Sequence, residues 1–254
     1  MLQVYQCEDS IEGIFTAIYR IYEDRNQHRE CCVRIDGELF LLAEYHQVET
    51  DPELAMKVIR TLYQRFGEED YLTICYALVS EDGDKANAVY HAVVYGLERK
   101  AGRGHLFDNL ADTYLHKVFS LARGARNESC HLKGFLRFEE TRQGFLYATI
   151  GPKNNVITFL MPHFADRFPM EDFIVHDRVR GIYGVHPAGG QWYLASGQQP
   201  EEGTFLPSAA EEQYQQLFRH FCSSIAIKDR KNLHLQRNLL PLRFRNDMVE
   251  FDSR

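Results

Sequence analysis

Three short apolar runs decide the fold class of this chain: Phe173-Ile174-Val175-His176, Gly181-Ile182-Tyr183-Gly184-Val185 and Gln191-Trp192-Tyr193-Leu194-Ala195. The runs are rich in aromatic and β-branched residues, and polar turns separate them at Arg178–Arg180 and Pro187–Gly190. This pattern is typical of neighbouring strands in a meander. The C-terminal half is therefore predicted to contain an antiparallel sheet.

The segments around these runs extend the pattern. Residues 134–140 alternate in character, and Phe145–Ile150 form a second β-rich run after Gly144, so a hairpin is predicted upstream of the meander. The apolar segment 156–168, between hairpin and meander, is expected to be part helical. Ser208 is placed to cap a long final helix.

The first half of the chain is predicted to be mostly helical. Ser10 precedes apolar residues that recur at spacings of three and four, and Asp51-Pro52 is a strong helix start that Gly67 ends. Further helices are predicted over residues 69–79, 84–100 and 109–123. The other segments are a possible strand at Leu2–Gln6, a polar irregular stretch at 24–38, and a stretch at 39–48 that fits a strand or a helix.

These patterns together predict an α+β fold. Residues 1–130 form a mainly helical region, which packs beside or around a mostly antiparallel sheet of about five strands. Residues 131–254 supply that sheet and a long C-terminal helix. The sequence leaves open whether the two regions are separate domains or one integrated domain.

Charge is unevenly distributed along the chain. The 254 residues carry 36 acidic and 29 Lys/Arg side chains, a formal net charge of −7. Residues 1–104 hold 11 Lys/Arg against 19 Asp/Glu, whereas residues 105–254 hold 18 against 17. Six basic residues and one acid lie between Lys228 and Arg245. Such a block can bind a polyanion within a net acidic protein, but it is equally typical of a solvated basic face.

The six cysteines form no recognisable pairs. None has Cys-x-x-Cys spacing, the adjacent Cys31 and Cys32 suit neither a mutual disulfide nor a zinc site, and Cys75 lies in an apolar run. The N-terminus lacks the features of a signal peptide, and no apolar stretch is long enough to span a bilayer. We expect a cytoplasmic protein with reduced thiols and no membrane association.

Signatures of several enzyme classes are absent from the sequence. It contains no Gly-x-x-x-x-Gly-Lys-Ser/Thr loop, no Gly-x-Ser-x-Gly elbow, no His-Glu-x-x-His pair and no zinc-deaminase signature. The Cys-x-x-x-Cys-x-x-Cys run of radical S-adenosylmethionine enzymes is also missing. Any catalytic site must be assembled from dispersed residues, and no cofactor is predicted.

Five blocks of the C-terminal half carry a family resemblance. They are residues 131–138, 144–152, 162–168, 174–180 and 229–244, and their order and spacing resemble the uncharacterised bacterial family described as probable DNA metabolism protein. Asp9–Tyr22 fits the opening helix of that family. One departure is Arg245, since the family pattern has a second aromatic residue after Phe244.

The resemblance implies a connection with DNA. Proteins of that family accompany a radical S-adenosylmethionine protein thought to modify or repair DNA, and some carry the same domain fused to a uracil-DNA-glycosylase-like domain. DNA and the radical S-adenosylmethionine protein are therefore the partners that the resemblance implies. It implies no particular activity.

Four residues are candidates for a polar site: His163, Arg167, Asp177 and Arg180. His163 and Arg167 share one face of a helix, and Asp177 and Arg180 lie where a predicted strand ends. A histidine can move a proton, an aspartate can orient it, and an arginine can grip phosphate. The same residues also fit a structural ion-pair network. His163, His176 and His186 match no standard zinc spacing, so no metal site is predicted.

The C-terminal segment holds the candidates for nucleic-acid contact, because basic and amide side chains suit phosphates and base edges. They are Lys228, Arg230, Lys231, Asn232, Gln236, Arg237, Arg243 and Arg245. In the structural alternative Asn232 caps a turn, and Leu233, Leu235, Leu239 and Leu240 pack against the protein. Phe135, Phe138 and Tyr147 could stack on bases, although aromatic residues on a half-buried sheet usually pack in the core.

The leading functional hypothesis is an accessory factor in DNA repair or DNA modification. It would bind DNA, the radical S-adenosylmethionine partner enzyme, or both. The alternative is an enzyme that acts on a nucleic-acid base or phosphate through His163, Arg167, Asp177 and Arg180. A second alternative is a pure protein-interaction module that uses the acidic helical half.

Overall fold

The computed structural model describes residues 1–35, 37, 40–99, 105–198, 200–201, 203–227 and 232–251. The chain divides into two compact units. The N-terminal unit comprises Met1–Asn127 and Lys153–Asn155, and the C-terminal unit comprises Glu128–Pro152 and Val156–Arg254.

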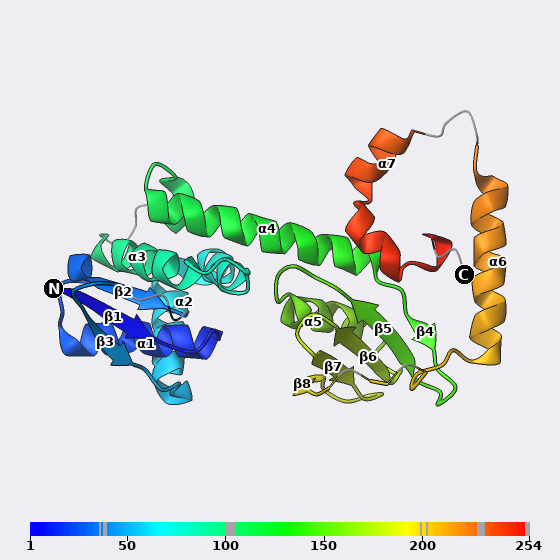
Figure 1. Ribbon diagram of the computed structural model, residues 1–254, viewed down its shortest axis with the longest axis horizontal. Helices are drawn as coiled ribbons and strands as arrows, with labels where there is room; N and C mark the ends of the chain where they lie inside the picture. Colours follow the sequence, from blue (N-terminus) through cyan, green and yellow to red (C-terminus); the bar gives the residue numbers. More distant parts are fainter. Residues whose placement is uncertain are drawn as a thin grey trace. The chain divides into compact units, whose positions relative to one another are not determined.

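The N-terminal unit is a small parallel sheet packed against helices (Figure 1), and its strand order is β2-β1-β3. Its elements are β1 (Leu2–Gln6), α1 (Ile11–Asp24), β2 (Cys31–Arg34), β3 (Ala43–Gln47), α2 (Pro52–Leu78) and α3 (Lys85–Glu98), with 3-10 turns η1 (His28–Glu30) and η2 (Leu106–Asp108). Helix α4 (Thr113–Phe135) begins in this unit and ends in the C-terminal unit.

Local sequence signals explain the helices of this unit. The Ser10 hydroxyl accepts a hydrogen bond from the Gly13 N–H at 3.0 Å and caps α1, as predicted. The Asp51 carboxylate caps α2 in the same way. Gly67 has φ of +82° and interrupts α2, which confirms the predicted break between two helical stretches.

The parallel sheet itself differs from the expectation for the first half. Strand β2 lies within the stretch interpreted as polar and irregular, and β3 resolves the ambiguous stretch as a strand. Cys31, Cys32 and Val33 are all buried, at 2%, 9% and 0% exposure. A strand covered on both faces lacks the alternation that reveals half-buried strands, so its sequence gave no signal.

The C-terminal unit is built on a five-stranded sheet of order β4-β5-β6-β7-β8. Three of its four strand pairings are antiparallel, and β5 and β6 pair in parallel because α5 connects them. The α+β prediction is confirmed. The elements are β4 (Glu139–Glu140), β5 (Leu146–Ile150), α5 (Ile157–Arg167), β6 (Phe173–Asp177), β7 (Ile182–His186), β8 (Tyr193–Ser196), α6 (Ala209–Ile225) and α7 (Leu233–Leu239), with 3-10 turns η4 (Leu242–Asp247) and η5 (Val249–Phe251).

The first strand of the predicted hairpin was placed too early, at residue 134, and this prediction is wrong. Helix α4 continues to Phe135, and only Glu139–Glu140 form a strand on this side of the sheet. Ala125, Leu132 and Leu136 are buried at helical spacing, and the Leu136 N–H donates to the Leu132 carbonyl at 2.9 Å. The chain therefore stays helical to Phe135, although the alternation of residues from 134 onward predicts a strand there.

Helix α5 covers one face of the sheet and supplies its core. Phe138 packs edge-to-face against Phe164, Phe168 and Phe173, with ring centroids 5.2–5.5 Å apart. Gly184 of β7 lets α5 approach closely, since a Cβ atom there would collide with the Met161 side chain. The face that carries Phe173, Val175 and Gly184 therefore points toward α5.

Two further expectations from the sequence can be compared with this structure. All six cysteines are free thiols, and Cys75 is buried as predicted, at 6% exposure. Within the part of the chain that the structure describes, no helix combines the length and the apolar character needed to cross a membrane.

Candidate functional site

Asp177 and Arg180 form an ion pair at the turn between β6 and β7. The Asp177 carboxylate is fully buried, and it accepts hydrogen bonds from the Val179 N–H at 2.9 Å and the Arg180 guanidinium at 3.1 Å. The same guanidinium donates to the Pro152 carbonyl at 3.2 Å. These contacts hold the turn against the loop that follows β5.

His163 and Arg167 lie elsewhere in the unit. Because β5 and β6 are parallel, the connecting α5 runs in the opposite direction, so Arg167 lies toward the start of β6, whereas Asp177 lies at the end of that strand. The half-buried His163 ring contacts Phe164, and burial, with Lys133 and Arg167 nearby, lowers the pKa of His163. The topology thus pairs Asp177 with Arg180 and separates both from Arg167.

A cluster that the sequence did not suggest lies on the other face of the sheet. Tyr147, His176 and Tyr183 come from three neighbouring strands, and we call them the open-face cluster. The Tyr147 hydroxyl lies 2.8 Å from His176 Nδ1, and the His176 and Tyr183 rings stack with centroids 4.3 Å apart. The Tyr183 hydroxyl donates to the Gln198 carbonyl at 2.7 Å.

His176 is the unusual member of the open-face cluster. It is 3% exposed, and its Nε2 atom has no hydrogen-bond partner among the described residues. Burial lowers the pKa of His176, against the opposing effect of Asp177, which favours a neutral ring. Burial also raises the pKa of Tyr147, so its phenol stays protonated and can donate to Nδ1. Strand alternation places His176 on the sheet face opposite to that of Val175, where Tyr147 and Tyr183 contact its ring.

The three histidines considered as zinc ligands do not converge. His176 lies on the open face, whereas His186 stacks on Phe173 with centroids 4.7 Å apart, on the face toward α5. His186 Nδ1 is also 3.1 Å from the Glu171 carbonyl. Among the described ranges, no group of three His, Cys, Asp or Glu side chains is arranged to hold a metal ion.

The basic candidates of the C-terminal segment have different environments. Asn232 caps α7, since its side chain accepts from the Leu235 N–H at 3.0 Å. Gln236 and Arg237 are exposed on α7. Arg243 pairs with the buried Glu128 at 3.3 Å, and Arg245 donates to the Leu240 carbonyl. Lys228, Arg230 and Lys231 lie outside the described residues.

The aromatic candidates for base stacking are also dispersed. Phe138 belongs to the core beneath α5, and Phe135 packs against Phe244 with centroids 5.5 Å apart. Tyr147 is half-buried on the open face, where its ring contacts Phe205. All three rings therefore make packing contacts, and Tyr147 makes its contact on the sheet face away from α5.

The expected packing of the C-terminal leucines is wrong, except that Leu240 is half-buried. Leu233, Leu235 and Leu239 are 52%, 53% and 67% exposed. Asn232 caps the helix α7 where the sequence suggested only a capped turn, and this helix has no buried side chain.

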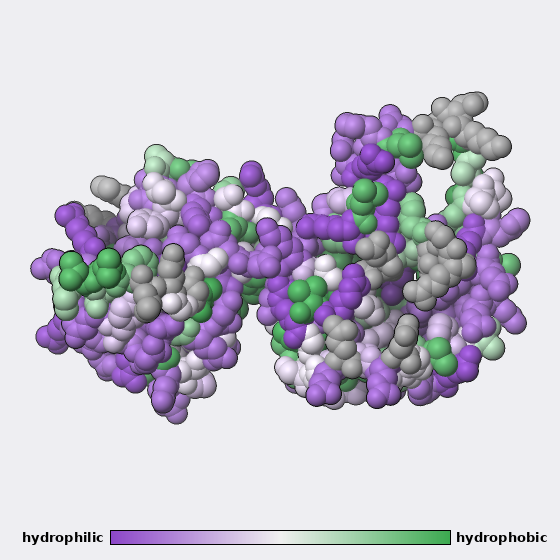
Figure 2. Space-filling view, in the orientation of Figure 1, coloured by the Kyte–Doolittle hydropathy of each residue, from purple (hydrophilic) through white to green (hydrophobic). Residues whose placement is uncertain are grey.

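Helix α6 shows an inverted amphipathic pattern, with its polar side chains toward the unit and its apolar side chains toward the solvent. Its half-buried side chains are polar or small, namely Glu211, Gln215, Arg219 and Cys222. Glu211 accepts from the Glu140 N–H, and Arg219 donates to the Val249 carbonyl, both at 3.2 Å. The apolar stripe faces away from the unit, and Figure 2 shows apolar atoms at the surface toward the upper end of α6. We call this stripe the α6 apolar stripe: Tyr214, Leu217, Phe218, Phe221 and Ile225, which are 41–69% exposed.

The amino-acid sequence matches the model of a protein family. A family model described as a domain of unknown function, DUF4130, matches residues 83–250. The chain belongs to this family. The DUF4130 match covers all five strands of the larger sheet, the ion pair, the open-face cluster and the α6 apolar stripe. No curated protein matches the chain.

Proposed function

We propose that this protein is an accessory factor in DNA repair or DNA modification, and that the α6 apolar stripe binds a radical S-adenosylmethionine enzyme. The observation that carries the proposal is the inverted pattern of α6. A surface helix normally turns its apolar side toward the core. Here the polar side contacts the unit, through Glu211 and Arg219, and the apolar side meets water.

The size of the stripe fits a protein partner. Its five large side chains expose on the order of 500 Å² of surface, at the upper end of what isolated monomers show. With a matching patch on a partner, this gives about 1,000 Å², the lower bound of a specific interface. The choice of partner rests on the resemblance of residues 131–245 to a family that accompanies a radical S-adenosylmethionine protein.

The test is a binding measurement between the full chain and the purified radical S-adenosylmethionine enzyme that accompanies it. Leu217→Glu and Phe221→Glu place a charge within the stripe, and each should weaken binding by about thirtyfold, as expected of hot-spot residues. Gln216→Glu adds the same charge at an exposed neighbouring position and should leave binding unchanged.

Three results would contradict this proposal. The first is the absence of a complex at tens of micromolar protein, and the second is equal binding by the Leu217→Glu variant. The third is a dimer of the wild-type chain that Leu217→Glu dissociates, since the stripe would then be covered by a second copy. Light scattering at several concentrations separates that case.

DNA is a second candidate ligand, favoured by the exposed Arg237 and Gln236 on α7. Phosphate contacts make DNA affinity fall with salt, and each lost contact reduces the salt slope by about one. Arg237→Ala should lower that slope, whereas Arg20→Ala should not, because Arg20 is paired with Glu23 in the N-terminal unit. No binding at low salt would exclude this candidate.

A further inference from the structure

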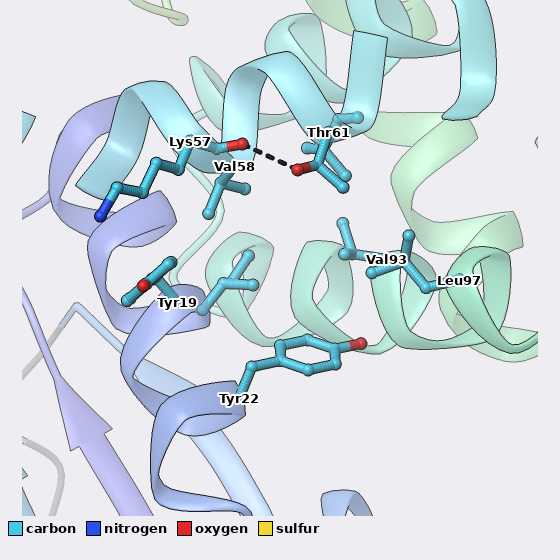
Figure 3. A pocket seen from close by; sticks show the side chains of 9 residues that line it. Tyr19, Tyr22, Lys57, Val58, Thr61, Val93 and Leu97 are labelled. Carbon is cyan, nitrogen blue, oxygen red and sulfur yellow. Dashed lines mark hydrogen bonds between the residues drawn. The ribbon is translucent and has the colours of Figure 1, made fainter. Parts of the chain in front are cut away.

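The N-terminal unit contains an apolar pocket between α1, α2 and α3 (Figure 3). Its volume is about 190 Å³. Aliphatic side chains form most of its wall: Ile18, Val58, Leu62, Val93 and Leu97. Tyr22 closes one side, opposite Val58 and Thr61 in Figure 3. The pocket lies entirely within one unit and has no role in the function proposed above.

The rim of the pocket carries a single cation. The Lys57 ammonium lies 5.3 Å from the centre of the Tyr19 ring, and no carboxylate pairs with it among the described residues. Two other lysines of the same unit are paired, Lys85 with Asp9 at 2.7 Å and Lys117 with Asp82 at 3.0 Å. Lys57 is therefore available to an anionic ligand.

The remaining polar groups of the rim limit the kinds of ligand that the pocket can bind. The Thr61 hydroxyl is already used, since it donates to the Lys57 carbonyl at 2.8 Å (Figure 3). Burial raises the pKa of Tyr22 to about 12, so its hydroxyl stays protonated, and it has no hydrogen-bond partner in the described part of the chain. The Glu98 carboxylate also raises the pKa of Tyr22, so the phenol side of the rim is unfavourable to an anion. The Lys57 ammonium, on the other side in Figure 3, is the group of the rim that suits one.

We propose that this pocket binds a small carboxylate whose apolar body is a single ring or about six carbons. A cavity of roughly 150 Å³ lined by apolar side chains accepts one benzene ring, so 190 Å³ has room for one ring and a short linker. The carboxylate lies at the rim against Lys57. A phosphate ester is less suited, because the rim has one cation and several apolar neighbours.

The experiment is a calorimetric or ligand-observed NMR titration of the full chain with phenylacetate, and with 2-phenylethanol as the neutral match. Phenylacetate is expected to bind with a dissociation constant of about 1 mM, given its ten heavy atoms. The alcohol should bind at least fivefold more weakly. Lys57→Gln should remove this difference, whereas Arg60→Gln removes the same charge one turn away and should preserve it.

A second variant tests whether the ligand binds in this pocket. Thr61 is exposed at the rim, so Thr61→Trp can fill the pocket from outside without disturbing the core, and it should abolish binding of both compounds. Circular dichroism confirms that the variants are folded. The proposal is overturned if wild type binds neither compound at 10 mM, if the alcohol binds as well as the acid, or if Lys57→Gln leaves the preference intact. Binding that survives Thr61→Trp would also overturn it.

Discussion

Removing the Asp177 carboxylate should destabilise the C-terminal unit by about 3 kcal/mol. Breaking a buried ion pair usually costs about 3–5 kcal/mol, because the remaining charge is left without compensation. The lower end applies here for two reasons. The Arg180 side chain is 21% exposed and keeps its bond to the Pro152 carbonyl, and the N–H of the exposed Val179 can turn to water.

The assay follows urea unfolding by the fluorescence of Trp192, the single tryptophan, which is half-buried next to β8. With a slope of about 2 kcal/mol per molar urea, Asp177→Ala should lower the midpoint by about 1.5 M. Asp166→Ala removes an exposed carboxylate on α5 and should change stability by less than about 0.5 kcal/mol.

A double-mutant cycle with Arg180→Ala isolates the pair itself. The coupling between Asp177 and Arg180 should be about 1–3 kcal/mol. If Asp177→Ala were as stable as wild type, or the coupling were zero, the pair would not be structural. The hypothesis of a catalytic site, in which Arg180 grips a phosphate and Asp177 orients a neighbouring group, would then gain, since functional groups often contribute little to stability.

Three further outcomes are expected. Lowering the pH from 7 to 5 should destabilise the C-terminal unit. Burial lowers the pKa of His176 below its unfolded value of about 6.5, so the unfolded chain binds more protons than the folded chain as the pH falls through that range; His176→Phe should reduce the fall in the urea midpoint. Gly184→Ala should cost about 1–3 kcal/mol, because its Cβ atom collides with the buried Met161, and an unchanged midpoint would contradict the close approach of α5. Gly67→Ala should cost about 1 kcal/mol or more in thermal unfolding, since φ is +82° there.

The fold was predictable where sequence signals were local. The meander strands alternate, and Ser10, Asp51 and Ser208 carry side chains that cap the next helix, so those elements were found. Of the parallel sheet of the N-terminal unit, only β1 was predicted as a strand, because the strands are short and paired over long sequence distances. Parallel pairing leaves no turn signature in the sequence.

The candidate site was less predictable, because the sequence does not show in which direction each helix and strand runs. Spacing placed His163 and Arg167 on one helix face and Asp177 at a strand end, but it could not show that α5 runs opposite to β6. The alternation of side chains between the two faces of a strand did contain one signal that the prediction left unused. Asp177 shares the parity of Phe173 and Val175, which are buried under α5, so its carboxylate was bound to need a partner.

The position of α3 shows that the boundary of the family match differs from the boundary between the two compact units. The DUF4130 match begins at Gly83, yet Val89, Tyr90 and Val93 of α3 are at most 1% exposed, within the same core as α1 and α2. The Tyr90 hydroxyl even lies 2.8 Å from His28 Nδ1, upstream of the match. A shortened protein that starts at Gly83 would therefore open this core to water and aggregate. A cut at Glu128 keeps that core, which ends at Ala122, on one side, although Lys153–Asn155 of the N-terminal unit fall on the other, so packing is the better guide for isolating the sheet-bearing unit.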